Sequence, residues 1–324
     1  MLFRSLGYGV LGAAGFSQAA MAGMFEKLDN ASRLNDNGSF PYLRSHPLTV
    51  ERMAEARSRA LFTGPESTKT PLRHALMQAR SRVLMDADPA QLRRYEDQAA
   101  GLPGAGARER MVSLYTGALA ATLQRHGAQA EKLAAQALEV TQQATPREPQ
   151  AERAVRLLQV QLRLANGDPS GALQALDAAG GDGQGARASL LYRGQALLDL
   201  QRLKGGAMPA LRESTETLQT WVAEHPADAD AWELLSSSAD AVGLKLRALR
   251  AGAESRAAIG DLTGAIDRLR AAQQASKGAA GQDFIEASVI DARLRELQAQ
   301  RRQLVLEARG GRPTRDGGDE PAPQ

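Results

Sequence analysis

The chain has 324 residues, no cysteine and a formal net charge of +3, with 40 Lys and Arg against 37 Asp and Glu. The lack of cysteine excludes disulfides, thiolate metal sites and cysteine nucleophiles. The small, dispersed basic excess is typical of a solvated surface and not of a nucleic-acid-binding face, which needs clustered basic residues. Aromatic residues make up only 4% of the chain. Period-two alternation is missing and apolar residues recur three and four apart, so the sequence predicts an all-α protein.

The first 25 residues imitate a secretory signal peptide, with Arg4, a mildly apolar stretch and a small-x-small site at 20–22. Four glycines interrupt the stretch: Gly7, Gly9, Gly12 and Gly15. Because an interior glycine costs a helix about 1 kcal/mol, we favour a helix end, a glycine turn and a new helix capped by Ser17. The apolar stripe of that helix is Met21, Met24, Phe25 and Leu28. No stretch reaches the ~20 apolar residues of a membrane span.

The segment "NDNGSFP" ends this helix, because asparagine, glycine and proline all break helices. Thr49 can cap a following helix that runs to about residue 60, and Glu51 suits its positive end. The segment "FTGPESTKTP" at 62–71 then indicates a linker.

Beyond the linker, apolar periodicity and short breakers predict consecutive helices. They lie at about 72–86, 89–100, 105–126, 128–144, 149–165, 169–179, 185–202, 208–224, 228–242, 244–259, 262–276 and 281–308. The segment after Gly310 is rich in glycine, proline and charge, which predicts a disordered tail.

Two segments of this region match each other: "GDPSGALQALDAA" at 167–179 and "GDLTGAIDRLRAA" at 260–272. Tetratricopeptide repeats have this pattern at the turn and second helix, with Gly in the turn, Asp capping the helix, a small Ala and a large apolar residue. The matching positions are Gly167, Asp168, Ala172 and Leu176, and Gly260, Asp261, Ala265 and Leu269. Trp232 and Leu235 fit the W-x-x-L of a first helix, and a looser copy lies at 125–140. A curved solenoid of helical hairpins is therefore predicted.

No catalytic motif is found in the sequence. H-E-x-x-H, G-x-S-x-G, the phosphate-binding loop and the dinucleotide-binding glycine pattern are all missing. The histidines are His46, His74, His126 and His225, and no two lie four apart. His126 and His225 lie at expected helix C-terminal ends, and Asp228 and Asp230 lie at an expected helix start, where capping explains them.

His46 has distinctive neighbours. The segment "LRSHPLTVERMAEAR" at 43–57 resembles the [ST]-H-P-x-x-x-x-R segment of HtpX-type zinc metallopeptidases, in particular the BepA-like periplasmic branch, which carries a tetratricopeptide tail. The segments at 7–33, 230–272 and 290–304 are also similar to parts of that family. The resemblance covers about 7–308 and is loosest between 72 and 225.

The chain departs from the family at its start. The family has H-E-x-x-H followed by E-x-x-A-D-x-x-G, and Gly7 matches the last glycine. The family's Asp then falls at Arg4, its Ala at Phe3, and its Glu before Met1. The zinc ligands and the general-base Glu are thus missing from the sequence, and "MLFRSL" resembles a false start or the truncated end of a longer reading frame.

The resemblance implies a domain organisation and a site. Residues 1–62 would be the C-terminal remnant of a peptidase domain, 63–71 a linker, 72–309 the helical repeat domain and 310–324 the tail. In a full-length parent, His46 would lie beside the zinc and could hold the enzyme shut as an extra ligand, with Arg52 on the same rim. The other interpretation is that His46 merely begins a turn before Pro47. Zinc is expected only in the parent, and no cofactor in this chain.

Three functional hypotheses remain. The first is the protein-binding region of a zinc metalloendopeptidase of envelope and outer-membrane protein assembly and quality control, catalytically incomplete as written. It would be periplasmic, with the true signal peptide upstream, and would bind protein or peptide clients, but no nucleic acid. The second is a working zinc endopeptidase, if upstream sequence is missing. The third is a free-standing adaptor that uses the first 60 residues as a docking helix pair.

Overall fold

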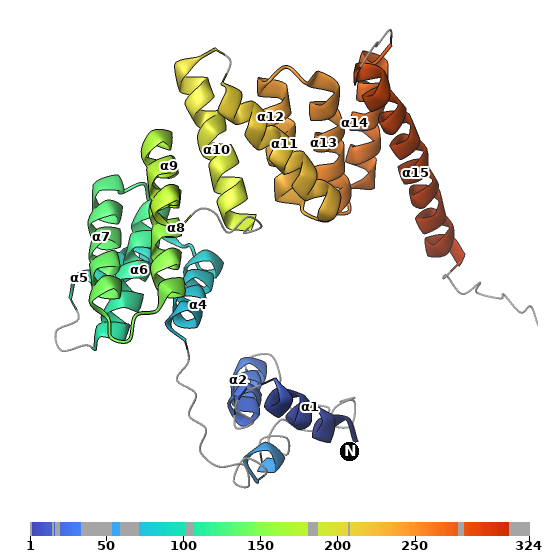
Figure 1. Ribbon diagram of the computed structural model, residues 1–324. Helices are drawn as coiled ribbons and strands as arrows, with labels where there is room; N and C mark the ends of the chain where they lie inside the picture. The colour runs from blue at the N-terminus through green and yellow to red at the C-terminus, as the bar shows by residue number, and fades with distance from the viewer. Residues whose placement is uncertain are drawn as a thin grey trace, which may run out of the picture. The chain divides into compact units, whose positions relative to one another are not determined.

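The computed structural model describes residues 2–14, 16, 20–33, 54–58, 71–101, 106–180, 187–206, 208–277 and 282–310. Within these residues all regular secondary structure is helical, which confirms the predicted all-α class (Figure 1). The chain divides into two compact units, unit 1 (Met1–Pro71) and unit 2 (Leu72–Gln324). The division falls where the sequence places the first repeat helix.

Unit 1 contains α1 (Leu2–Ala13), α2 (Ala20–Arg33) and a short helical segment at 54–58. The expected glycine turn is wrong in part, because α1 runs through Gly7, Gly9 and Gly12 before it ends. Gly7 lets α1 pack closely on α2, since a Cβ at this position would lie 3.3 Å from the Met21 Cε of α2.

The core of unit 1 is small. Ala22 of α2 and Ala56 are buried, and Met21 and Phe25 pack partly buried against them. Met24 is exposed, so the predicted apolar stripe is wrong at that position. The Leu28 side chain, Ser17, His46, Thr49, Glu51, Arg52, most of the linker and the tail from 311 lie outside the described residues.

Unit 2 is a row of stacked helices that follow one another along the chain (Figure 1). They are α4 (Leu72–Met85), α5 (Pro89–Ala100), α6 (Ala107–Leu123), α7 (Gly127–Gln143), α8 (Pro149–Ala165), α9 (Pro169–Ala178), α10 (Arg187–Lys204), α11 (Pro209–Glu224), α12 (Ala229–Ala241), α13 (Lys245–Ala258), α14 (Leu262–Ala275) and α15 (Gln282–Gly310). Each predicted helix of this region is confirmed. The largest displacement is at the end of α6, which stops at Leu123 because Arg125 takes a positive φ of 61°.

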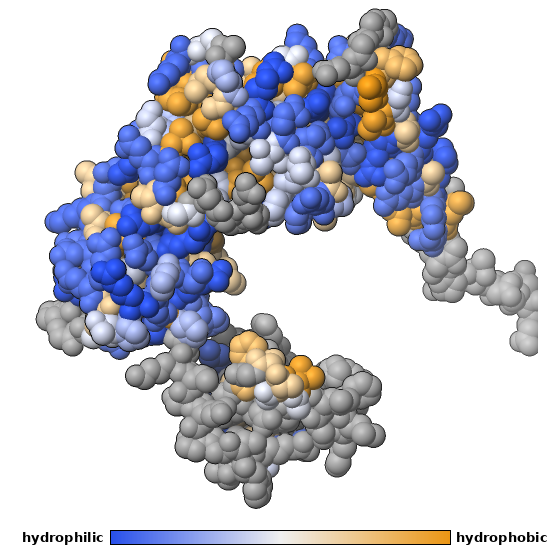
Figure 2. Space-filling model, viewed as in Figure 1, coloured by the Kyte–Doolittle hydropathy of each residue, from blue (hydrophilic) through white to orange (hydrophobic). Residues whose placement is uncertain are grey.

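The helices of unit 2 form two rows. From α5 onward each helix packs on the next, and α4, α6, α8, α10 and α12 also contact one another in succession. We call these five helices the inner row, because the side of a stacked array on which alternate helices approach most closely is its concave side. The array is therefore an α-helical repeat solenoid. The face of unit 2 seen in Figure 2 is mostly hydrophilic, with apolar residues scattered over it.

The two matching turns have the same geometry. Gly167 and Gly260 have positive φ values of 74° and 84°, a backbone conformation that only glycine adopts at no cost. Asp168 Oδ1 then accepts the N–H of Gly171 at 2.8 Å. Asp261 does the same for Gly264 at 2.9 Å.

The fifth residue of each repeat is glycine because of that cap. A Cβ on Gly171 or Gly264 would collide with the capping carboxylate. Beyond the cap, the predicted packing residues lie in the core: Ala172, Leu176, Ala265, Leu269, Trp232 and Leu235 are all buried. The sequence motif therefore describes a turn and its packing.

The first-helix motif at Trp232 does not lie on the helix that precedes the second turn. The turn at Gly260 joins α13 to α14, and Trp232 lies one helix earlier, on α12. Trp232 packs in the core shared by α10, α11 and α12. The two patterns therefore belong to successive hairpins that share α13.

His126 lies between two helices. Its backbone N–H donates to the Ala121 carbonyl of α6 at 2.9 Å, which agrees with the expected position at a helix C-terminal end, and it is also the residue directly before α7. Its Nδ1 lies 3.1 Å from Glu96 Oε2 of α5. His225 does end α11, where its ring stacks on Trp221 with centroids 3.8 Å apart.

Candidate peptide-binding hollow

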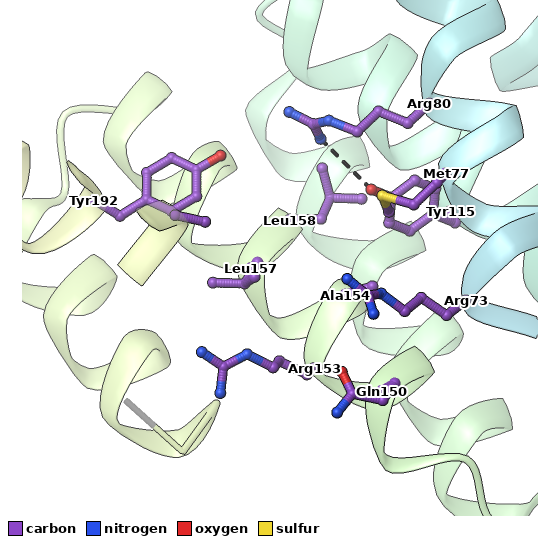
Figure 3. A pocket seen from close by; sticks show the side chains of 11 residues that line it. Arg73, Met77, Arg80, Tyr115, Gln150, Arg153, Ala154, Leu157, Leu158 and Tyr192 are labelled. Atoms are coloured by element: carbon purple, nitrogen blue, oxygen red, sulfur yellow. Dashed lines mark hydrogen bonds between the residues drawn. The ribbon is translucent and has the colours of Figure 1, made fainter. Parts of the chain in front are cut away.

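The inner row carries a hollow of about 270 Å³. Four helices line it, α4, α6, α8 and α10, and Figure 3 shows it from close by. The lining residues are Arg73, Met77, Arg80, Tyr115, Gln150, Arg153, Ala154, Leu157, Leu158, Ala188 and Tyr192.

Helical spacing explains why these side chains share one surface. Arg73, Met77 and Arg80 are four and three residues apart, so they lie on one face of α4. The core-facing residues of α4 occupy a different face: Leu72, Leu76, Ala79 and Val83. On α8 the lining positions also recur three and four apart, from Gln150 to Leu158. The hollow thus lies along the adjoining faces of α4 and α8, and side chains of α6 and α10 complete it.

Arg80 is held at one end of the hollow. Its Nη2 donates to Gln161 Oε1 at 2.8 Å, and its Nη1 lies 3.5 Å from the Tyr115 hydroxyl (Figure 3). Tyr192 Oη lies 3.5 Å from the same Gln161 oxygen. Burial raises the pKa of Tyr115, so its hydroxyl stays neutral. Arg80 is therefore an oriented, partly buried cation whose neighbours are uncharged.

Arg153 is held from the other side. Its Nη1 donates to the Gly180 carbonyl at 2.8 Å and its Nη2 to Ser189 Oγ at 2.9 Å. These bonds tie the end of α9 to the start of α10 and fix the guanidinium at the wall of the hollow. Arg73 is exposed and makes no ion pair within the described residues.

The described residues that line the hollow carry only positive charge. None of them is acidic. Two carboxylates at the start of α8 have partners outside the hollow: Glu148 accepts the Leu72 N–H at 2.7 Å, and Glu152 pairs with Arg156 at 2.8 Å. Arginine side chains with no internal carboxylate can bind an acidic ligand.

A second charged cluster lies at the starts of α10 and α12, and its arginine is paired with carboxylates of the chain. Arg187 contacts Asp228 at 2.7 Å and Asp230 at 2.6 Å. Asp228 also accepts from Trp221 Nε1 at 2.9 Å and caps α12 through the Ala231 N–H. The Arg187 guanidinium, with these two N–H donors, holds the pKa of Asp228 well below its usual range. The capping role expected for Asp228 is confirmed, and Asp230 binds Arg187 instead.

The sequence did not identify the residues of the hollow. Its predicted residues are in turns and cores, or lie outside the described part of the chain, as His46 and Arg52 do. His74 is exposed on α4 and lines no part of this hollow. A four-and-three spacing of Arg73, Met77 and Arg80 was available as a signal. To use this spacing, one must know which face of α4 lies on the side of the inner row.

No His, Asp and Glu side chains gather into a group of three able to hold a metal ion within the described residues. Across the same part of the chain, none of the helices combines the length and the apolarity of a bilayer-crossing segment. A scan of protein-family models and a search of curated proteins found no match to this chain. Its function is therefore argued from the hollow and from the resemblance of its motifs.

Proposed function

We propose that unit 2 is a protein-binding array that holds an extended segment of a partner protein on its inner row. One observation carries the proposal: four stacked helices contribute apolar, aromatic and arginine side chains to one hollow. Stacked helical repeats use such concave surfaces to bind peptides, and aromatic and aliphatic walls with a few oriented polar groups are typical of binding sites.

The resemblance to HtpX-type metallopeptidases suggests what this binding serves. On that basis the array presents clients of the periplasm, such as outer-membrane assembly proteins, to a zinc metallopeptidase. The alternative is an adaptor with no link to proteolysis.

The peptidase hypothesis has its own test in a full-length parent. If His46 blocks the zinc, His46→Ala should raise basal proteolysis. Arg52→Ala should change substrate handling at constant zinc content.

Peptide binding is tested with an immobilised library of short peptides and two methionine variants of the same helix. Met77, which is 36% exposed, lines the hollow, and Met85, which is 88% exposed, does not. We expect Met77→Ala to weaken the selected peptides about fivefold, because apolar area is lost, and Met85→Ala to leave them unchanged. If no peptide is selected, or if both variants bind like the parent chain, the proposal is wrong.

The peptidase link predicts no catalysis by the chain as written. Catalytic zinc needs about three protein ligands and an open water position. His74, His126 and His225 lie on separate helices or helix ends of unit 2. We expect no stoichiometric zinc after dialysis and no casein cleavage that a chelator abolishes. Stoichiometric zinc that remains after dialysis, or casein cleavage that a chelator abolishes, would show a zinc site that the sequence does not reveal.

A further inference from the structure

We infer that the hollow selects extended segments with an acidic, an apolar and a second acidic side chain at alternate positions. The inference rests on the proposed function and names the chemistry of the partner. It starts from the charge of the hollow: Arg73, Arg80 and Arg153 line it, and no acidic residue lines it within the part of the chain that the structure describes.

The cations lie at two ends of the hollow. Figure 3 shows Arg80 with Tyr115 and Tyr192 toward one end, Arg73, Arg153 and Gln150 toward the other, and Leu157 and Leu158 between them. Arg73 and Arg80 are seven residues apart on α4, which places their Cα atoms about 10 Å apart along the helix axis. One carboxylate can therefore pair with the cation at one end only.

An extended peptide matches this arrangement. Its side chains alternate in direction, and each residue advances the chain by about 3.3 Å. Positions 1, 3 and 5 of such a segment face one side, and positions 1 and 5 lie about 13 Å apart. This spacing exceeds the distance of about 10 Å between the Cα atoms of Arg73 and Arg80. The arginine and glutamate side chains are long enough to make up the difference. The middle side chain then meets the half-buried Leu157, below which Leu158 is buried in the core.

The arginines at the two ends can each bind a carboxylate and keep the hydrogen bonds that orient them. A guanidinium has five N–H donors, and Arg80 uses Nη1 and Nη2 toward Tyr115 and Gln161. Arg153 donates from Nη1 and Nη2, and its Nε makes no hydrogen bond within the described part of unit 2. Because Arg80 is partly buried, a carboxylate there is less screened by water than on an open surface.

Two other hollows of unit 2 have a different charge pattern. The one beside α5 contains Glu109 next to Arg82 and Arg108, and the one beside α12 contains Asp228 and Asp230 with Arg187. Their arginines have acidic neighbours in the lining. Selection of acidic segments is therefore assigned to the inner-row hollow and not to these two.

The experiment measures fluorescence anisotropy of labelled, C-terminally amidated peptides with the core Glu-Ser-Leu-Ser-Glu, against the same peptide with both Glu replaced by Gln. We expect the Glu peptide to bind about tenfold more tightly or better, and its affinity to fall with salt. Arg73→Gln should remove up to half of the difference in binding free energy, because Arg80 still pairs with the carboxylate at the other end, and Arg73→Lys should remove less. The control is Arg93→Gln, at an exposed position of α5 outside the hollow, which should bind like the parent chain.

The outcomes separate the inference from the proposed function. Equal binding of the Glu and Gln peptides, with both weakened by Met77→Ala, would overturn acidic selection and leave peptide binding standing. Binding of neither peptide, with no library selection, would overturn both. A Gln peptide with a free C-terminus that binds as tightly as the Glu peptide would show recognition of a terminal carboxylate. A single-stranded oligonucleotide that displaces the Glu peptide would show phosphate recognition. Either of the last two results contradicts the inference.

Discussion

The hollow of the inner row and the cluster at the start of α12 use the same side chain in opposite ways. In the hollow, Arg73 has no ion pair within the described residues and Arg80 has only neutral partners. In the cluster, Arg187 is shared by Asp228 and Asp230. The cluster therefore contributes to stability, because its charges are paired inside the chain. The hollow is left with charge for a partner, so its arginines contribute to binding.

The strongest test of this difference is Asp228→Ala. It removes the carboxylate that pairs with Arg187, accepts from Trp221 and caps α12. A lost cap and a lost charge-assisted hydrogen bond together cost about 3 kcal/mol of the free energy of unfolding. Thermal unfolding followed by circular dichroism measures the loss. Peptide affinity at temperatures where the variant is folded should not change, and a large affinity loss with little loss of stability would reverse the roles of the two regions.

Acid provides a second test of the same residue. The pKa of Asp228 is lowered in the folded state, mainly by its hydrogen bonds to Arg187. The carboxylate therefore contributes stability that is present above its unfolded pKa of about 4 and is lost as the pH falls through the lower folded pKa. We expect the melting temperature to fall between about pH 4 and pH 2, and to fall less steeply in Asp228→Asn.

The matched control for the acid test is Asp177→Asn, because Asp177 pairs with Arg193 at 2.8 Å but is 64% exposed. Exposed pairs contribute only about 0–1 kcal/mol, so this variant should keep the slope of the parent chain. If both variants lower the slope equally, burial of the Asp228 cluster is not the cause.

Arg73→Gln tests the hollow from the other side. Because this side chain is exposed and unpaired within the described residues, the free energy of unfolding should change by less than about 0.5 kcal/mol. Affinity for the Glu peptide should fall about threefold, which corresponds to about 0.7 kcal/mol of binding free energy. Calorimetric unfolding and anisotropy on the same preparation give both values. A clearly lower melting temperature of this variant would show that Arg73 contributes to stability and not only to binding.

The smallest effect is expected from removing unit 1. Both regions lie in unit 2, which has its own hydrophobic cores. A chain that begins at Thr70 should keep its helical circular dichroism, its melting temperature within a few degrees and its peptide affinity. If this shorter chain is unfolded, the two units share a core and the boundary at Pro71 is not a folding boundary.

Much of the fold was predictable from sequence. The helices of unit 2 lie where apolar periodicity and breakers place them, and the turns at Gly167 and Gly260 have the positive φ and the Asp cap that the repeated motif predicts. The errors arose where a local signal was ambiguous. The glycines of α1 were interpreted as a turn, but Gly7 permits close approach to Met21.

The hollow was not predictable in the same way. Whether Arg73 or Arg187 is neutralised depends on which carboxylate comes near it in space, and Asp228 lies 41 residues from Arg187 along the chain. His126 gives a similar lesson, since its partner Glu96 lies 30 residues away on α5. Composition and motif spacing carry no information on such pairs.

The sequence alone determined the helices, the order of the hairpins and the chemistry of their turns, because backbone hydrogen bonds and capping act between residues a few positions apart. Only the tertiary structure decided which helices form the inner row and which arginines lack an acidic partner. The stacking of α4 on α6 and α8 brings Arg73, Tyr115 and Arg153 to one hollow. The sign and the availability of charge at a surface are set by every element packed around it, and that sum exists only once the chain has folded.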